Sequence, residues 1–361
     1  MHYFKYADKD ATLYEASASL NTGIDEILSI AKYVDSANVS RNTRIVIYFD
    51  LTTINALKAS GLIVSESYYL NLFTSNAEAL PLSYDVEAYP LSLSFQMGTG
   101  TSTSNPEINN GVSWKYRNGD TNAAIWPTES FAAGSTGSWA TTAGGGAWYI
   151  SPNATQSFEY ETSDIRMNVT DIVLSQSLGI IPNYGLILKR TDAAETGSSE
   201  YGILNFFSTD THTIYIPRLE VVWDDSVIAS GSATGSSVEV TSSAVVSVKN
   251  LNPEYRTGTK AQFRIATRPQ WITKTFVTQS QYAIPYMLST ASYYSIRDAR
   301  TDEVIVPFGS GSRLSRDSNG SYFNLWFKGF QPERFYRVLV QATIGGTEQT
   351  FENVATFKVI R

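Results

Sequence analysis

The chain has 361 residues, of which 42% are hydrophobic and 13% aromatic, so it carries enough apolar material for more than one packed core. Tyr, Phe, Val, Ile and Thr suit the half-buried surface of a β-sheet, and the many Gly, Ser, Thr and Asn residues suit turns. The net charge of −7 and the absence of any Lys/Arg run argue against a nucleic-acid partner. We therefore expect an all-β protein that does not bind nucleic acid.

Three further features bear on where the chain folds. It has no cysteine, so its folding does not depend on disulfides. Its first ten residues lack the apolar core of a secretory signal, and no stretch approaches the 18 apolar residues of a membrane span. We expect a protein made in a reducing cytoplasm, with no membrane partner.

The first ninety residues show short strand patterns separated by turns. The strongest is Arg44–Leu51, whose nearly continuous apolar run predicts a strand buried on both faces. Thr52–Ser60, closed by Gly61, is the predicted helix. Alternating patterns predict further strands at Thr12–Tyr14, Glu26–Ile30, Ser67–Phe73 and Tyr84–Pro90.

Between residues 92 and 149 the strand pattern stops. Gly, Ser, Thr and Asn dominate there, but four tryptophans are interspersed: Trp114, Trp126, Trp139 and Trp148. So long an irregular region is usually a binding surface or disordered, and four Trp residues argue against plain disorder. These four residues are the candidate interaction surface.

Regular strand patterns resume after this region and predict the rest of a first domain, residues 1–228. Residues 229–236 have the Gly/Ser-rich composition of a flexible linker. Residues 237–361 then show strands and turns at the spacing of an immunoglobulin-like β-sandwich, including a hairpin turn at Gly345–Gly346. The strands expected after residue 150 are Phe158–Tyr160, Ile165–Val169, Gly185–Lys189, Ile203–Phe207, Ile214–Trp223, Val245–Val248, Gln262–Ala266, Tyr293–Ile296, Tyr322–Phe327, Phe335–Val340 and Ala355–Val359.

Signatures of catalysis are scarce. The chain has two histidines, His2 and His212, and we interpret His212 as a polar residue at a strand edge rather than a base. No Gly-x-Ser-x-Gly motif occurs. The Gly-rich segments Gly134–Gly137 and Gly144–Gly146 lack the end of a phosphate-binding loop and are interpreted as flexible loops. We expect no catalytic residue, no cofactor and no enzyme activity.

Two acidic pairs are candidate calcium ligands, because their carboxylates supply hard oxygen atoms and calcium often fixes loops in β-sandwiches. They are Asp8 with Asp10 and Asp224 with Asp225. Neither pair lies in a recognisable calcium loop, so we interpret them as solvated carboxylates and predict no metal site.

The Trp-bearing region allows two binding functions and one structural role. Flat indole rings beside Asn118, Asp120, Asn122 and Glu129 have the chemistry of a glycan site. Trp residues are also enriched in protein interfaces, and they are common in cores. Sequence alone leaves these alternatives open.

The N-terminal strand order resembles that of DNRLRE-type domains, which are jelly-roll sandwiches related to carbohydrate-binding modules. The likeness is in strand order and spacing, and the family's literal motif is absent. It is carried by residues 10–15, 21–28, 44–51, 69–72 and 86–90. The resemblance implies a jelly-roll-type fold for residues 1–228.

The whole chain resembles virion structural proteins of tailed bacteriophages, especially contractile-tailed phages of marine bacteria. The segments that carry this likeness are residues 110–117, 211–221 and 293–299. The resemblance implies a capsid-, neck- or tail-associated protein of the virion, assembled in the host cytoplasm and present in multiple copies or as a homo-oligomer. Its partners would be other virion proteins, and the alternative is a glycan-binding adsorption module on the same particle.

Overall fold

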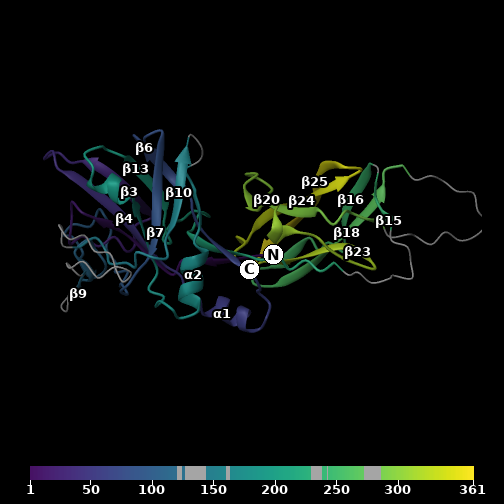
Figure 1. Ribbon diagram of the computed structural model, residues 1–361, viewed down its shortest axis with the longest axis horizontal. Coiled ribbons are helices and arrows are strands. Elements are labelled where there is room, and N and C mark those ends of the chain that lie inside the picture. Colours follow the sequence, from purple (N-terminus) through teal and green to yellow (C-terminus); the bar gives the residue numbers. More distant parts are fainter. Residues whose placement is uncertain (120–123, 127–143, 160–162, 229–237, 242, 272–285) are drawn as a thin grey trace, which may run out of the picture. The chain divides into compact units, whose positions relative to one another are not determined.

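The computed structural model of the protein describes residues 1–119, 124–126, 144–159, 163–228, 238–241, 243–271 and 286–361 (Figure 1). Of these residues 48% lie in strands and 8% in helices, which confirms the all-β prediction. Within the described part of the chain, no helix combines the length and apolar character needed to cross a membrane.

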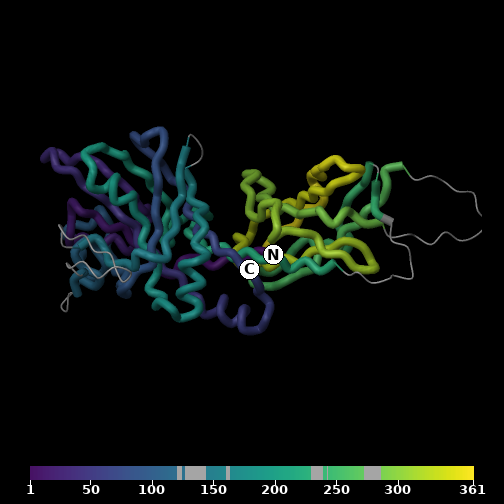
Figure 2. Tube along the Cα trace, viewed as in Figure 1, coloured from purple at the N-terminus to yellow at the C-terminus, as the bar shows by residue number. Residues whose placement is uncertain are grey.

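The chain forms two compact units, and each contains segments that are far apart in the sequence. The N-terminal unit comprises Lys5–Ser60 and Ser67–Glu220. The C-terminal unit comprises Met1–Phe4, Gly61–Glu66 and Val221–Arg361. The chain therefore passes between the units four times, after residues 4, 60, 66 and 220, as the colours in Figure 2 allow the reader to follow. The predicted linker, residues 229–236, lies outside the described residues.

Most strands of two sheets belong to the N-terminal unit. The smaller sheet has the order β1-β14-β5-β11, formed by β1 (His2–Tyr6), β14 (Arg218–Val222), β5 (Ser67–Leu72) and β11 (Ile165–Asn168). The larger has the order β10-β7-β12-β4-β3-β13-β6, with β2 also paired to β4. Its strands are β2 (Lys9–Tyr14), β3 (Ile27–Val34), β4 (Ser40–Tyr48), β6 (Thr74–Glu78), β7 (Ser83–Pro90), β10 (Ala154–Glu159), β12 (Leu186–Arg190) and β13 (Gly202–Phe207). A separate pair joins β8 (Tyr116–Asn118) and β9 (Ala124–Ile125).

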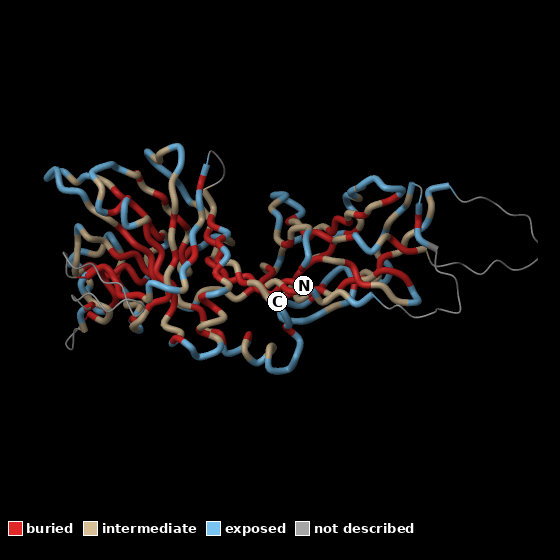
Figure 3. The backbone as a smooth tube through the Cα atoms, in the orientation of Figure 1, coloured by how far each residue is buried: buried red, intermediate tan, exposed pale blue. Residues whose placement is uncertain are grey.

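Strand β4 lies inside the larger sheet, as its apolar sequence predicted. Ile45, Val46 and Ile47 are each fully buried, although consecutive strand residues point to opposite faces. Both faces of the sheet are therefore covered at β4. The buried residues, red in Figure 3, run along the strands of this unit.

The predicted helix is confirmed as α1 (Thr52–Ala59), and two further helices were not predicted. These are α2 (Thr170–Ser177) and α3 (Asp192–Thr196). The hydroxyl of Thr191 accepts a hydrogen bond from the backbone N–H of Ala194, which caps α3. This short helix carries one of the central acidic residues of the site described below.

Two more sheets form the C-terminal unit. One has the order β15-β19-β18-β23-β22, with β16 paired to β18, and the other has the order β17-β25-β24-β20-β21. Aromatic rings fill its core, for example Tyr294 against Phe323 at 4.0 Å and Tyr255 against Phe327 at 4.7 Å. The elements are β15 (Val238–Glu239), β16 (Ala244–Lys249), β17 (Glu254–Arg256), β18 (Lys260–Pro269), β19 (Tyr286–Met287), β20 (Ser292–Asp298), β21 (Val304–Val306), the 3₁₀ turn η1 (Ser310–Ser312), β22 (Ser315–Asp317), β23 (Gly320–Trp326), β24 (Arg334–Ile344) and β25 (Thr347–Ile360).

The predicted turn between β24 and β25 is present. Gly345 and Gly346 both have positive φ, at 59° and 82°, as a two-residue hairpin of this type requires.

The first four residues of the chain complete the core of the C-terminal unit. Phe4 is 1% exposed and packs edge-on against Phe330, with ring centroids 6.3 Å apart. The terminal amine donates hydrogen bonds to the carbonyl oxygens of Trp223 and Gly311 and lies 3.3 Å from the Asp225 carboxylate. Asp225, weighed above as a calcium ligand, is thus paired with an ammonium group.

We predict that Phe4→Ala lowers the free energy of unfolding of the C-terminal unit by about 3–5 kcal/mol, because it leaves a cavity among aromatic rings. Phe335→Ala is the matched control, since Phe335 is 57% exposed and its truncation should cost less than about 1 kcal/mol. Hydrogen exchange of β20 and β24 amides in urea measures both effects. Equal losses for the two variants would contradict the packing role of Phe4.

Candidate functional site

The described part of the Trp-bearing region packs as an extra layer on one face of the larger sheet. From the sheet, β2, β4 and β12 contribute Ala11, Leu13, Val46 and Ile187, which share one face by strand register. Against this face lies a second set of buried residues: Leu91, Phe95, Val112, Trp114, Trp126, Ala147 and Trp148. The irregular region is therefore part of the core where the structure describes it.

This packing corrects the prediction of an exposed Trp surface at three positions. Trp114, Trp126 and Trp148 are at most 6% exposed, and the Trp126 indole N–H donates to the carbonyl oxygen of Ser113 at 3.0 Å. Their rings serve as core, one of the alternatives that the sequence left open, and they offer no flat face to a sugar. Trp139 lies outside the described residues.

A buried arginine explains why two of these rings, Trp114 and Trp148, turn inward. Arg44 on β4 is 1% exposed, and its guanidinium lies 4.7 Å from the Trp114 ring centroid and 5.2 Å from that of Trp148. A cation against indole faces is attracted by the ring quadrupole, and more strongly when water is excluded. The two rings thus shield the Arg44 guanidinium from water, and the cation–π contacts stabilise the buried position of the rings.

Glu195 of α3 neutralises Arg44 through a bidentate pair. The Nε and Nη2 atoms of Arg44 donate to the two carboxylate oxygens at 3.0 and 2.8 Å, and both side chains are buried. Nη1 donates to the carbonyl oxygen of Gly145. The planar fork of arginine suits this arrangement, which a lysine could not reproduce.

A second buried cation, Lys189 on β12, extends the network. Its amine donates to Asp192 at 2.6 Å and lies 3.5 Å from Glu195 and 3.9 Å from Glu87. It also lies 5.7 Å from the Trp148 ring centroid. Lys189 and Glu195 are thus paired inside the fold, and Asp192 extends the network to the surface.

The Gly144–Gly146 triplet is tightly packed, which corrects its interpretation as a flexible loop. All three residues are buried with φ between 80° and 115°. A Cβ on Gly145 would lie 2.4 Å from Nη1 of Arg44, and one on Gly144 would lie 2.1 Å from the carbonyl oxygen of Trp114. Glycine is needed here because the backbone approaches Arg44 and Trp114 so closely.

A cavity of about 280 Å³ opens beside β7, β10 and α3. Its lining is mainly polar and includes Asp85, Glu159 and Tyr201. The nearby Arg190 is fully buried against the Tyr84 ring, and burial lowers the pKa of its guanidinium to about 10. The polar side chains that line the cavity carry hydroxyl and carboxylate groups, and Arg190 is not among the lining residues.

The other residues singled out from the sequence have ordinary surroundings. His212 is exposed in the loop before β14, 3.5 Å from the Glu26 carboxylate. Asp8 pairs with Lys5 at 2.7 Å. Among the residues that the structure describes, no group of three or more His, Cys, Asp or Glu side chains could hold a metal ion.

Sequence reasoning missed Arg44, Lys189 and Glu195. The sequence did contain a sign of the two cations. Arg44 and Lys189 occupy strand positions where the apolar pattern calls for a buried hydrophobic residue, which indicates a buried charge. Nothing in the sequence indicated that Glu195 would supply the countercharge.

Comparison of the chain with protein-family models and with curated proteins gave no match. The resemblance to phage virion proteins therefore stays a prediction.

We predict that Arg44→Met lowers the free energy of unfolding of the N-terminal unit by about 3–5 kcal/mol, because it leaves Glu195 buried without its main partner. The double variant Arg44→Met/Glu195→Leu should lose less stability than Arg44→Met alone, because it leaves no unpaired carboxylate at position 195. Lys189 still has Asp192 and Glu87 as acidic partners in the double variant. Urea unfolding followed by Trp fluorescence measures both. Additive losses would contradict direct coupling between the two side chains.

Asp10 is a separate buried acid in this unit. Its carboxylate accepts hydrogen bonds from the backbone N–H and the hydroxyl of Thr209, both at 2.9 Å. Burial nevertheless raises the pKa of Asp10 to about 7, with a smaller contribution from the charge of Asp210. Asp10, weighed above as a calcium ligand, is thus held inside the fold.

We predict that the stability contributed by Asp10 falls as the pH rises from about 4 to 7. The unfolded carboxyl releases its proton near pH 3.9, whereas the folded one holds it until about pH 7, so the native state binds more protons in this window. The free energy of unfolding should fall by up to a few kcal/mol relative to Asp10→Asn, at about 1.36 kcal/mol per pKa unit. Urea titrations of both proteins from pH 4 to 8 measure the difference, and parallel pH profiles would contradict it.

Proposed function

We propose that the chain is a structural component of a bacteriophage virion, associated with capsid, neck or tail, that works by docking onto other virion proteins. The N-terminal unit would be a jelly-roll-type sandwich and the C-terminal unit an immunoglobulin-like one. The proposal rests on the sequence resemblance at residues 110–117, 211–221 and 293–299. The observation that carries the docking role is the fixed polar surface on the Trp-bearing layer.

One side chain holds the backbone of this layer in place. Asn21 is fully buried, and its amide donates to the carbonyl oxygens of Met97 and Val112 at 2.6 and 2.8 Å. Its Oδ1 accepts the backbone N–H of Gly100 at 2.8 Å. A Cβ on Gly98 would lie 2.3 Å from the same oxygen, so the loop closes tightly around Asn21.

The outer side of the layer consists mostly of short hydrogen-bonding side chains. Its exposed residues are Ser94, Gln96, Thr99, Ser102, Thr103, Asn105, Pro106, Glu107, Asn109, Asn110 and Lys115, together with the apolar Ile125. Ser, Thr and Asn adapt readily to a partner's polar groups, and a backbone that is already ordered loses little entropy on binding. We call these residues the docking surface.

The connection between the units also supports a structural role. The chain passes between the units four times, so the two units are joined by four covalent connections and not by a single linker. The short segments Met1–Phe4 and Gly61–Glu66 both belong to the C-terminal unit.

Mass spectrometry of purified particles from the phage that encodes the chain tests the proposal. We expect the protein in mature virions, and we expect Gln96→Arg/Glu107→Arg to reduce its incorporation about tenfold by placing two new charges on the docking surface. Glu200→Arg/Glu352→Arg is the control, because both residues are exposed and lie outside that surface. Absence of the wild-type protein from the virions would overturn the proposal.

Glycan binding on such a particle is not supported by Trp114, Trp126 and Trp148, because all three are buried. It stays a prediction without these rings as its platform. A multimeric state within the particle likewise stays a prediction.

A further inference from the structure

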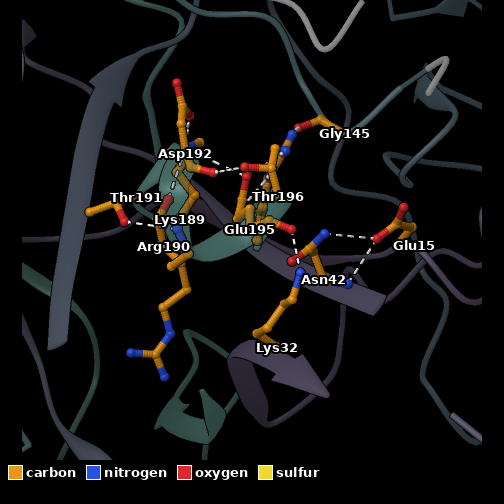
Figure 4. A network of polar contacts seen from close by, with 12 residues as sticks. Glu15, Lys32, Asn42, Gly145, Lys189, Arg190, Thr191, Asp192, Glu195 and Thr196 are labelled. Carbon is orange, nitrogen blue, oxygen red and sulfur yellow. Dashed lines mark hydrogen bonds and ion pairs between the residues drawn. The ribbon is translucent and has the colours of Figure 1, made fainter. Parts of the chain in front are cut away.

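Lys32 and Asn42 face each other across the β3–β4 pair. They are direct partners in the antiparallel register, so their side chains lie on the same face of the sheet, with Cβ atoms about 4.5–5.5 Å apart. Figure 4 shows the amine end of Lys32 beside the side-chain amide of Asn42, beneath α3. A primary amine and a carboxamide are thus brought together by the fold.

The lysine is held in a form suited to nucleophilic attack. Lys32 is 2% exposed, and its amine donates a hydrogen bond to the backbone carbonyl oxygen of Glu195. Burial lowers the pKa of the Lys32 amine, although Glu15 and Glu195 act in the opposite direction. The neutral amine, which is the nucleophile, is therefore more populated than on an exposed lysine.

The side-chain amide nitrogen of Asn42, the atom that an attack on this amide would displace, is hydrogen-bonded to the carboxylate of Glu15. Oε2 of Glu15 accepts hydrogen bonds from the backbone N–H of Asn42 at 2.8 Å and from its Nδ2 at 3.0 Å (Figure 4). The other amide atom, Oδ1 of Asn42, is buried without a hydrogen-bond partner among the described residues. Glu15 can therefore pass a proton to Nδ2, while the carbonyl of the amide stays open to attack.

We propose that Lys32 and Asn42 form an intramolecular isopeptide bond, with Glu15 as the proton carrier. The neutral Nζ of Lys32 attacks Cγ of Asn42, Glu15 accepts a proton from Nζ and delivers it to Nδ2, and the Cγ–Nδ2 bond breaks. The products are an Nζ–Cγ amide and one ammonia, so the chain loses about 17 Da. The step needs no oxidant, reductant or cofactor.

The bond closes the β3–β4 hairpin and fixes its register two residues before Arg44. Register matters here because a one-residue slip would send Arg44 to the opposite face of the sheet. The cross-link therefore secures the strand that supports the Trp-bearing layer. It acts once per molecule and stands independently of the proposed particle role.

Intact-mass spectrometry of the purified full-length chain tests the proposal. We expect a mass about 17 Da below the sequence mass, and a branched tryptic peptide that joins the segments containing Lys32 and Asn42. Lys32→Arg, Asn42→Ala and Glu15→Gln should each restore the full mass. Asn205→Ala is the control, since Asn205 is hydrogen-bonded to Asn76 on a neighbouring strand, and it should keep the deficit.

Loss of ammonia at an Asn-Gly sequence would lower the mass by the same amount. The peptide map distinguishes the two reactions, because it locates the residue that has lost ammonia. A deficit located at Asn110, Asn118 or Asn319, each followed by glycine, would overturn the proposal, as would the full sequence mass for the wild-type chain. The wild-type map gives this answer even where a variant does not fold.

Discussion

The burial of one guanidinium organises the N-terminal unit. Taking an arginine out of water costs several kcal/mol unless its donors and its charge are matched. Arg44 is matched by the Glu195 carboxylate, the Gly145 carbonyl oxygen and two indole faces. These partners come from α3 and from two parts of the Trp-bearing region, one at Trp114 and one at Gly145 and Trp148, so Arg44 joins three segments to β4. The outer layer and the docking surface on it depend on this match.

Much of the fold could be predicted from local patterns. The apolar run of β4, the alternation of β7 and the Gly345–Gly346 turn each follow from the geometry of strands and hairpins. Helix α2 was missed because its residues follow a strand directly, and the apolar pattern of β11 continues into it. Short helices of this kind depend on packing more than on propensity.

The site could not be predicted because its contacts are distant in sequence. Arg44 and Glu195 are 151 residues apart, and Arg44 and Gly145 are 101 apart. Four tryptophans in a polar loop are equally compatible with a binding face and with a core, and only the position of Arg44 decides between them for Trp114 and Trp148. The same holds for Phe4, whose place in the C-terminal unit no local pattern reveals.

The architecture of the N-terminal unit depends on the Trp-bearing region being a fixed layer on the sheet. Native-state hydrogen exchange of the amides of Val112, Trp126 and Gly145 tests it most directly, because they donate to the carbonyl oxygens of Gln96, Lys115 and Trp114. A fixed layer predicts protection comparable to that of the β4 amides. Exchange at the rate of an unstructured loop would contradict it.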